Sequence, residues 1–232
     1  MFNYIMRTLA VSLLFVVATP SQAALFVYED LTANSGGAIG DRLNTVRGSY
    51  DDITQDFTWD VTLNTHNYID GFWLVVNNGP NPKSSDVNEL AIMYGDLATN
   101  TLTTYVYNGL NKSNSWNTPG IFLQTDSITS TSNSFGININ AANINSWFAD
   151  PFQGIAFDED IGIWMHLSMN SIFEYGDDEG GNQLIDEYGY QTQGWYDRAW
   201  LTATKVPTQV PEPGSLALLG LGLAALSFRR RK

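Results

Sequence analysis

Hydrophobic and polar residues alternate within short segments along most of the chain. In residues 57–63 (FTWDVTL) every second side chain is apolar, which is the pattern of a strand with one buried face. Residues 71–76 (GFWLVV) form a nearly continuous apolar run, and this predicts a central strand covered on both faces. Further strand-like segments follow at residues 89–94, 102–107, 120–125, 134–140, 154–157, 161–167 and 200–206.

The spacing of these segments predicts the fold class. Turn-forming residues separate the strands at intervals of about ten residues, as in residues 77–82 (NNGPNP), and this is typical of a β-sandwich or jelly roll. A helical pattern is confined to one or two turns within residues 141–148. The middle contains no repeat and no low-complexity linker. We therefore expect one all-β, β-sandwich or jelly-roll-like domain over residues 24–206.

The segment before this domain has the features of a secretory signal peptide. Residues 9–18 (LAVSLLFVVA) are uncharged and follow Arg7, and small residues stand at Ser21 and Ala23. A short positive region, an apolar core and a small-x-small exit define such a peptide. We expect residues 1–23 to be removed by signal peptidase after translocation by the general secretion machinery. A buried helix of a cytosolic domain is the alternative.

The segment after the domain, residues 207–232, predicts a membrane anchor. Residues 215–228 carry no charge, and four cations follow at residues 229–232. At 1.5 Å per residue this helix would be about 21 Å long, shorter than the roughly 30 Å hydrocarbon core. The terminal cations stay on the cytoplasmic side, and their long side chains shorten the required span. With Arg7 also cytoplasmic, the residues between the two segments face the other side of the membrane.

Pro211, Glu212 and Pro213 stand just before the predicted anchor, where the two prolines disfavour helix. This motif, the short apolar span and the cation cluster together resemble the PEP-CTERM sorting signal of Gram-negative bacteria that make exopolysaccharide. The resemblance implies that an exosortase, a membrane-embedded cysteine transpeptidase, recognises Pro211, Glu212 and Pro213 and cuts nearby. It implies a transient anchor followed by delivery to the cell surface or the extracellular matrix.

Two segments of the middle domain, residues 70–83 and 194–197, are similar to segments of other PEP-CTERM proteins of unassigned activity. This resemblance implies a shared sandwich fold and no catalytic residues.

Composition limits the function classes further. Residues 24–210 hold six basic and 23 acidic side chains, a net charge of −17, which repels nucleic acid and anionic lipid. The same charge keeps the domain soluble in a polyanionic matrix. The chain has no cysteine, so disulfides and thiol chemistry are excluded.

Acidic residues gather in a loop at Asp177, Asp178, Glu179 and Asn182. Calcium prefers several oxygen ligands, which such a loop can supply, although the spacing does not match an EF-hand. A second acidic cluster occupies residues 158–160. The alternative for both is a solvated connection between strands. We expect no other cofactor.

Aromatic residues offer the better indication of a ligand. The chain has seven tryptophans and eleven tyrosines, and Trp116, Trp195 and Tyr196 lie in polar, turn-like sequence. Exposed aromatic faces near amides and carboxylates commonly bind sugar rings, so these three residues are candidate glycan-binding residues. The alternative is that they cap the core or a sheet edge. Trp59, Trp73 and Trp164 lie in predicted strands, where we expect core residues.

Evidence for catalysis is weaker. A glycosidase needs two carboxylates facing each other across a cleft. Glu89 and Glu174 are the acids to test, since each lies in or beside a predicted strand. His166 lacks the G-x-S-x-G context of a serine hydrolase. We therefore expect an exported, non-enzymatic protein of adhesion or exopolysaccharide association, with a carbohydrate-active enzyme or a calcium-stabilised structural module as alternatives.

Overall fold

The computed structural model describes residues 24–34, 36–39, 42–64, 69–79, 90–107, 119–149, 153–177 and 179–207. Six features predicted from the sequence lie outside these residues: the signal peptide, the sorting tail after Pro207 with its Pro-Glu-Pro motif, the apolar span of that tail, Trp116, Glu89 and Asp178. Ala24–Val206 forms one compact unit. Within the described ranges no helix is both long enough and apolar enough to cross a membrane.

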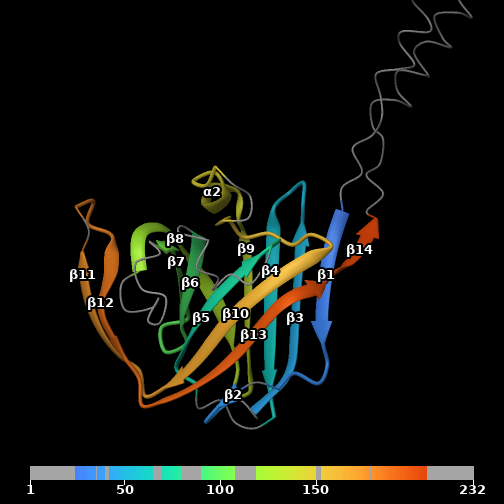
Figure 1. The fold of residues 1–232 in the computed structure, drawn as a ribbon. Helices are drawn as coiled ribbons and strands as arrows, with labels where there is room; N and C mark the ends of the chain where they lie inside the picture. The colour runs from blue at the N-terminus through green and yellow to red at the C-terminus, as the bar shows by residue number, and fades with distance from the viewer. Residues whose placement is uncertain are drawn as a thin grey trace, which may run out of the picture. The chain divides into compact units, whose positions relative to one another are not determined.

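The described residues are almost entirely β-structure, which confirms the predicted all-β class (Figure 1). The elements in chain order are β1 (Ala24–Asp30), β2 (Gly36–Gly37), β3 (Leu43–Asp51), β4 (Asp56–Leu63), β5 (Gly71–Asn77), β6 (Leu90–Asp96), β7 (Thr101–Tyr107), β8 (Pro119–Ser130), β9 (Ser134–Asn140), α2 (Ala142–Asn145), β10 (Asp160–Met169), β11 (Ile172–Asp177), β12 (Gln183–Gly189), β13 (Thr192–Thr202) and β14 (Thr204–Pro207).

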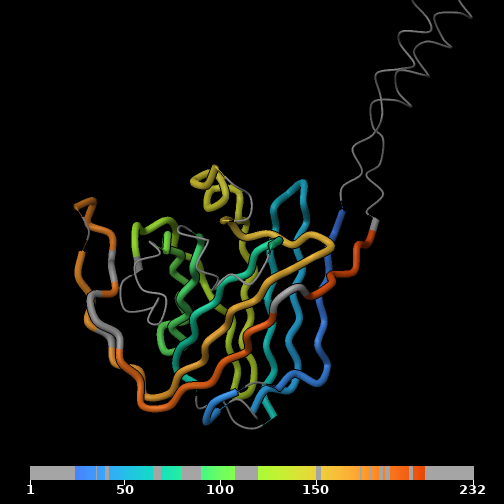
Figure 2. Tube along the Cα trace, in the orientation of Figure 1, coloured from blue at the N-terminus to red at the C-terminus, as the bar shows by residue number. Residues whose placement is uncertain are grey.

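Twelve of the strands form one curled sheet in the order β14-β1-β3-β4-β9-β8-β7-β6-β5-β10-β13-β2 (Figures 1 and 2). Strand β8 pairs with β7 as far as Ser127 and with β9 from Ile128 onward. We call the strands from β14 to β9 the A half and those from β7 to β2 the B half. The two layers expected of a sandwich thus belong to one sheet that bends at β8.

The inner faces of the two halves enclose the main core. Strand β4 contributes Phe57, Trp59 and Val61 from alternate positions, and all three are fully buried. Across the core, Phe72 of β5 stacks on Phe135 of β9 with ring centroids 4.4 Å apart. At period two, one face of each A-half strand enters the core and the other meets solvent.

The B half is buried on its outer face as well. All seven residues of β5 are buried, which confirms the prediction from its continuous apolar run. Trp73, Tyr94, Tyr105 and Trp164 belong to a second hydrophobic cluster on this face. Strands β11 and β12 form a separate hairpin that continues from β10 and β13 (Figure 1), and its Ile185 joins this cluster.

Segment 154–157 is not a strand, so the prediction there is wrong. Its apolar residues Ile155 and Phe157 are buried, but the side-chain amide of Asn145 takes the place of a neighbouring strand. Asn145 Nδ2 donates to the Ile155 carbonyl (2.9 Å), and the Ile155 N–H donates to Asn145 Oδ1 (2.8 Å). An apolar loop pinned into a core has the same sequence pattern as a buried strand.

The sheet edge formed by β14 and β1 has two notable contacts. The Ala24 N–H, at the start of β1, donates to Asp52 Oδ1 at 2.8 Å, and the Asp52 N–H donates to the Ala24 carbonyl. Further along β1, Tyr28 shares a 2.6 Å hydrogen bond with Tyr196 of β13, and the Tyr196 hydroxyl lies 2.7 Å from Asp30. The two hydrogen bonds of Tyr196 connect the A half to the B half.

Candidate functional site

Strand β13 places its side chains alternately on the two faces of the B half. Trp195 lies on the outer face and is 42% exposed, whereas Tyr196 turns inward and is fully buried. The expectation that both rings form one exposed platform is therefore wrong for Tyr196. Consecutive strand residues point to opposite faces, and the polar sequence around Tyr196 concealed this, because its hydroxyl is satisfied by Tyr28 and Asp30.

The indole of Trp195 lies over two glycines of β2. In register, Trp195 is opposite Gly36 and Gly194 is opposite Gly37. A Cβ atom at Gly36 would collide with the indole ring, and one at Gly37 would approach it within 2.9 Å. Glycine in β2 thus permits the ring to pack against the backbone, which holds an exposed aromatic side chain in place.

A polar cluster surrounds Trp195 on the same face. Gln193 and Asp197, the alternate residues of β13, are partly exposed on either side of the indole. Behind them lies His166, only 6% exposed, with its ring centroid 6.5 Å from that of Trp195 and 4.2 Å from that of Trp164. His166 thus packs between Trp164 and Trp195 beneath the outer face.

The hydrogen bonds of His166 assign its role. Gln193 Nε2 donates to His166 Nδ1 at 2.7 Å, and the other ring nitrogen, Nε2, lies 3.4 Å from Asp197 Oδ1. The imidazole therefore holds the Gln193 amide by a hydrogen bond and lies beside the Asp197 carboxylate. A buried ring held in this way is a positioning residue, in line with the interpretation of His166 as a strand residue.

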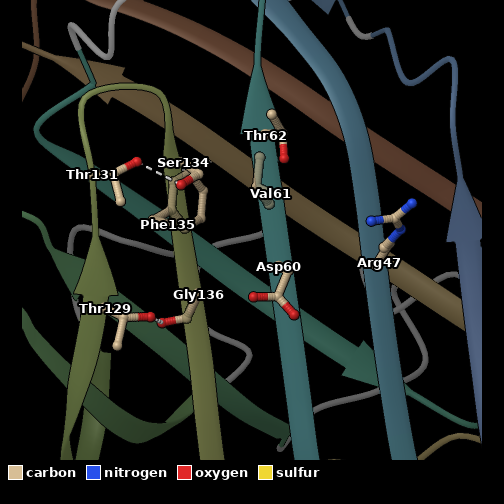
Figure 3. Close-up of a pocket in the computed structure, with 9 residues that line it drawn as sticks. All are labelled: Arg47, Asp60, Val61, Thr62, Thr129, Thr131, Ser134, Phe135 and Gly136. Atoms are coloured by element: carbon tan, nitrogen blue, oxygen red, sulfur yellow. Dashed lines mark hydrogen bonds between the residues drawn. The ribbon is translucent and has the colours of Figure 1, made fainter.

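The outer face of the A half carries a second candidate, which the sequence analysis missed. A cavity of about 300 Å³ is lined by Arg47, Asp60, Thr62, Thr129, Thr131, Ser134 and Gly136, among others (Figure 3). Burial raises the pKa of the Asp60 carboxyl above its ordinary value, and the positive charge of Arg47 partly opposes this. The polar positions 58, 60 and 62 of β4 were the available signal, but only the register brings them beside β9.

A comparison with family models identifies a sorting signal in the last part of the chain. Residues 209–232 match the PEP-CTERM protein-sorting motif. The chain carries a PEP-CTERM sorting signal. This confirms the resemblance drawn from Pro211, Glu212 and Pro213, which lie within the match. The PEP-CTERM signal implies export, a membrane-anchored sorting tail and an exosortase as processing partner.

The PEP-CTERM match covers the tail alone. No curated protein and no solved structure matches the chain. The resemblance of residues 70–83 and 194–197 to other PEP-CTERM proteins therefore stays a prediction, and the function of the β domain has to be argued from its geometry.

The acidic loop lies at the tip of the β11–β12 hairpin. Asp177, Glu179 and Asn182 are exposed there, and Gly181 has a positive φ of 77°. In the part of the chain that the structure describes, no three histidine or acidic side chains are grouped to hold a metal ion. Because Asp178 lies outside these residues, calcium binding by the loop stays a prediction.

The remaining catalytic candidate, Glu174, lies on β11 with its side chain exposed. Its register partner on β12 is Glu187. The described structure places Glu174 outside the lining of the cavity of the A half.

Proposed function

We propose that this is an exosortase-sorted protein of the cell surface or extracellular matrix whose β domain binds exopolysaccharide without cleaving it. The observation that carries the proposal is Trp195, an exposed indole fixed between the glycines of β2 and His166. The C–H face of a pyranose packs on an aromatic ring, and this burial supplies affinity at little entropic cost when the ring is already held.

The residues beside Trp195 support this assignment. The Gln193 amide and the Asp197 carboxylate lie on the same outer face, on either side of the indole, and can form hydrogen bonds with sugar hydroxyls. The −17 charge of residues 24–210 disfavours a strongly anionic polymer. We therefore propose a neutral polysaccharide as the ligand.

Affinity electrophoresis of the processed protein in the exopolysaccharide of its own host tests the proposal. We expect retardation of the wild type, loss of retardation in Trp195→Ala and retention in Trp195→Phe. Trp147, which is 51% exposed beside α2, provides a matched control, because Trp147→Ala removes an exposed indole elsewhere. Equal retardation of wild type and Trp195→Ala would refute the site.

A reducing-sugar assay on the same samples separates binding from catalysis. We expect no product with time. The enzyme alternative predicts product that disappears on loss of a single carboxylate, such as Glu89 or Glu174, and its appearance would replace our proposal.

A further inference from the structure

The cavity of the A half lies in a row of register partners that crosses five strands. The row runs from Glu29 through Arg47 and Asp60 to Gly136 and Thr129. Gly136 has no side chain, and this leaves an open space in the row. A Cβ atom there would lie 2.5 Å from Asp60 Oδ1 and 3.1 Å from Thr129 Oγ1. The cavity therefore exists because β9 has glycine opposite an aspartate.

Hydroxyl groups form the other wall of the cavity. Thr131 and Ser134 share a 2.6 Å hydrogen bond between their hydroxyls, and Thr129 Oγ1 donates to the Gly136 carbonyl at 3.3 Å (Figure 3). The first lies at the β8–β9 turn, and the second joins the two strands beside that turn. They hold the hydroxyl oxygens at the rim, where each oxygen keeps acceptor capacity for a ligand.

The two charged side chains that line the cavity differ in their partners, because Arg47 is paired and, among the described residues, Asp60 is not hydrogen-bonded. Arg47 Nε donates to Glu29, and in Figure 3 the guanidinium of Arg47 points away from Asp60. The Asp60 carboxylate accepts no hydrogen bond from any residue that the structure describes. This carboxylate is open to solvent at the cavity, so both of its oxygens can accept hydrogen bonds from the hydroxyls of a ligand.

We propose that this cavity binds one neutral sugar residue, with Asp60 accepting hydrogen bonds from two adjacent hydroxyls and the Thr131–Ser134 pair contacting the opposite side of the ring. Asp60 would repel an anion, and the hydroxyl groups of the lining can share hydrogen bonds with a neutral ligand rich in hydroxyls. The volume of about 300 Å³ is at the small end of ligand sites, which range over roughly 300–1,000 Å³.

This site is independent of the one at Trp195. The cavity opens on the outer face of the A half, whereas Trp195 lies on the outer face of the B half. With both sites occupied, one protein molecule would hold two polysaccharide strands, so the protein would cross-link the matrix that it binds.

Titration of the processed, isotope-labelled protein with methyl glycosides of neutral hexoses, followed by amide NMR shifts, tests the proposal. We expect shifts at Gly136 and Thr131 and a loss of affinity of about tenfold or more in Asp60→Asn, which keeps the shape of the site but removes the charged acceptor. Thr58→Ala alters the same face outside the cavity lining and should bind as the wild type does.

Two further variants make the result unambiguous. Gly136→Ala should abolish the shifts by filling the cavity, and if it fails to fold, Ser134→Ala provides the second test, with weakened binding expected. Trp195→Ala should leave the titration unchanged, so failure of this site and failure of the Trp195 site are distinguishable. Absence of shifts with every hexoside, equal affinity in Asp60→Asn, or stronger shifts with ammonium ions than with sugars would overturn the proposal.

Discussion

Replacing Trp73 by alanine tests how the outer face of the B half is held together. Trp73 is 1% exposed, and its ring centroid lies 4.6 Å from that of Tyr94. Its register partners are His166 on one side and Tyr94 on the other. Removing a buried indole of this kind costs about 3–5 kcal/mol, through lost apolar burial and the cavity that remains.

The same row of partners contains the control. Trp195 is opposite His166, so it lies two strands away from Trp73, but it is 42% exposed. Its truncation should cost less, about 1–2 kcal/mol, since a large part of the indole is already exposed to solvent. For a domain of this size, the Trp73→Ala cost corresponds to a fall in melting temperature of roughly 6–20 °C.

Urea denaturation monitored by far-ultraviolet circular dichroism measures both variants. We expect a large fall in midpoint for Trp73→Ala and a small one for Trp195→Ala, with unchanged m-values. Equal losses in the two variants would show that Trp195 is part of the core, and this would remove the structural basis of the proposed glycan site.

Three further predictions concern processing, calcium and pH. Alanine at both Pro211 and Glu212 should leave an uncleaved, membrane-bound precursor in the native host, and mass spectrometry showing wild-type removal of the tail would contradict the sorting assignment. If the loop at 177–182 binds calcium, EDTA should lower the melting temperature by several degrees, whereas identical melting curves with EDTA and with added calcium leave a solvated loop. Burial raises the pKa of Tyr50 to about 12, so stability that is complete below pH 10 should fall as the pH rises towards 12. Dichroism at fixed urea concentrations over this pH range measures the effect, and a flat profile would contradict it.

The fold was predictable where local periodicity and burial agree. Strand β4 alternates because one face enters the core, and β5 is apolar throughout because both faces are covered. The local pattern gave a wrong prediction where a tertiary contact takes the place of strand pairing. At Ile155 the backbone forms hydrogen bonds with the side chain of Asn145 instead of a neighbouring strand. The pattern also failed at β1, whose apolar residues follow the predicted signal peptide directly.

The candidate sites show the same division. Trp195 could be selected from sequence, because it lies in a polar, turn-like stretch. Tyr196 could not be separated from it, since its burial depends on hydroxyl partners on β1, 166 and 168 positions away. The cavity at Asp60 depends on Gly136, which becomes its neighbour only through the pairing of β4 with β9.

The pairing of β14 with β1 at one edge of the A half has a consequence for export. The first strand begins at Ala24, directly after the expected signal peptidase cut, and the last strand ends at Pro207, four residues before Pro211. The two strands that connect to the flanking segments are neighbours in the sheet. Such a domain can fold while both flanking segments are inserted in a membrane, because folding does not require these segments to move apart. Signal cleavage would then turn the Ala24 amide into an ammonium group beside Asp52, adding an ion pair to the hydrogen bond at the point where the leader was attached.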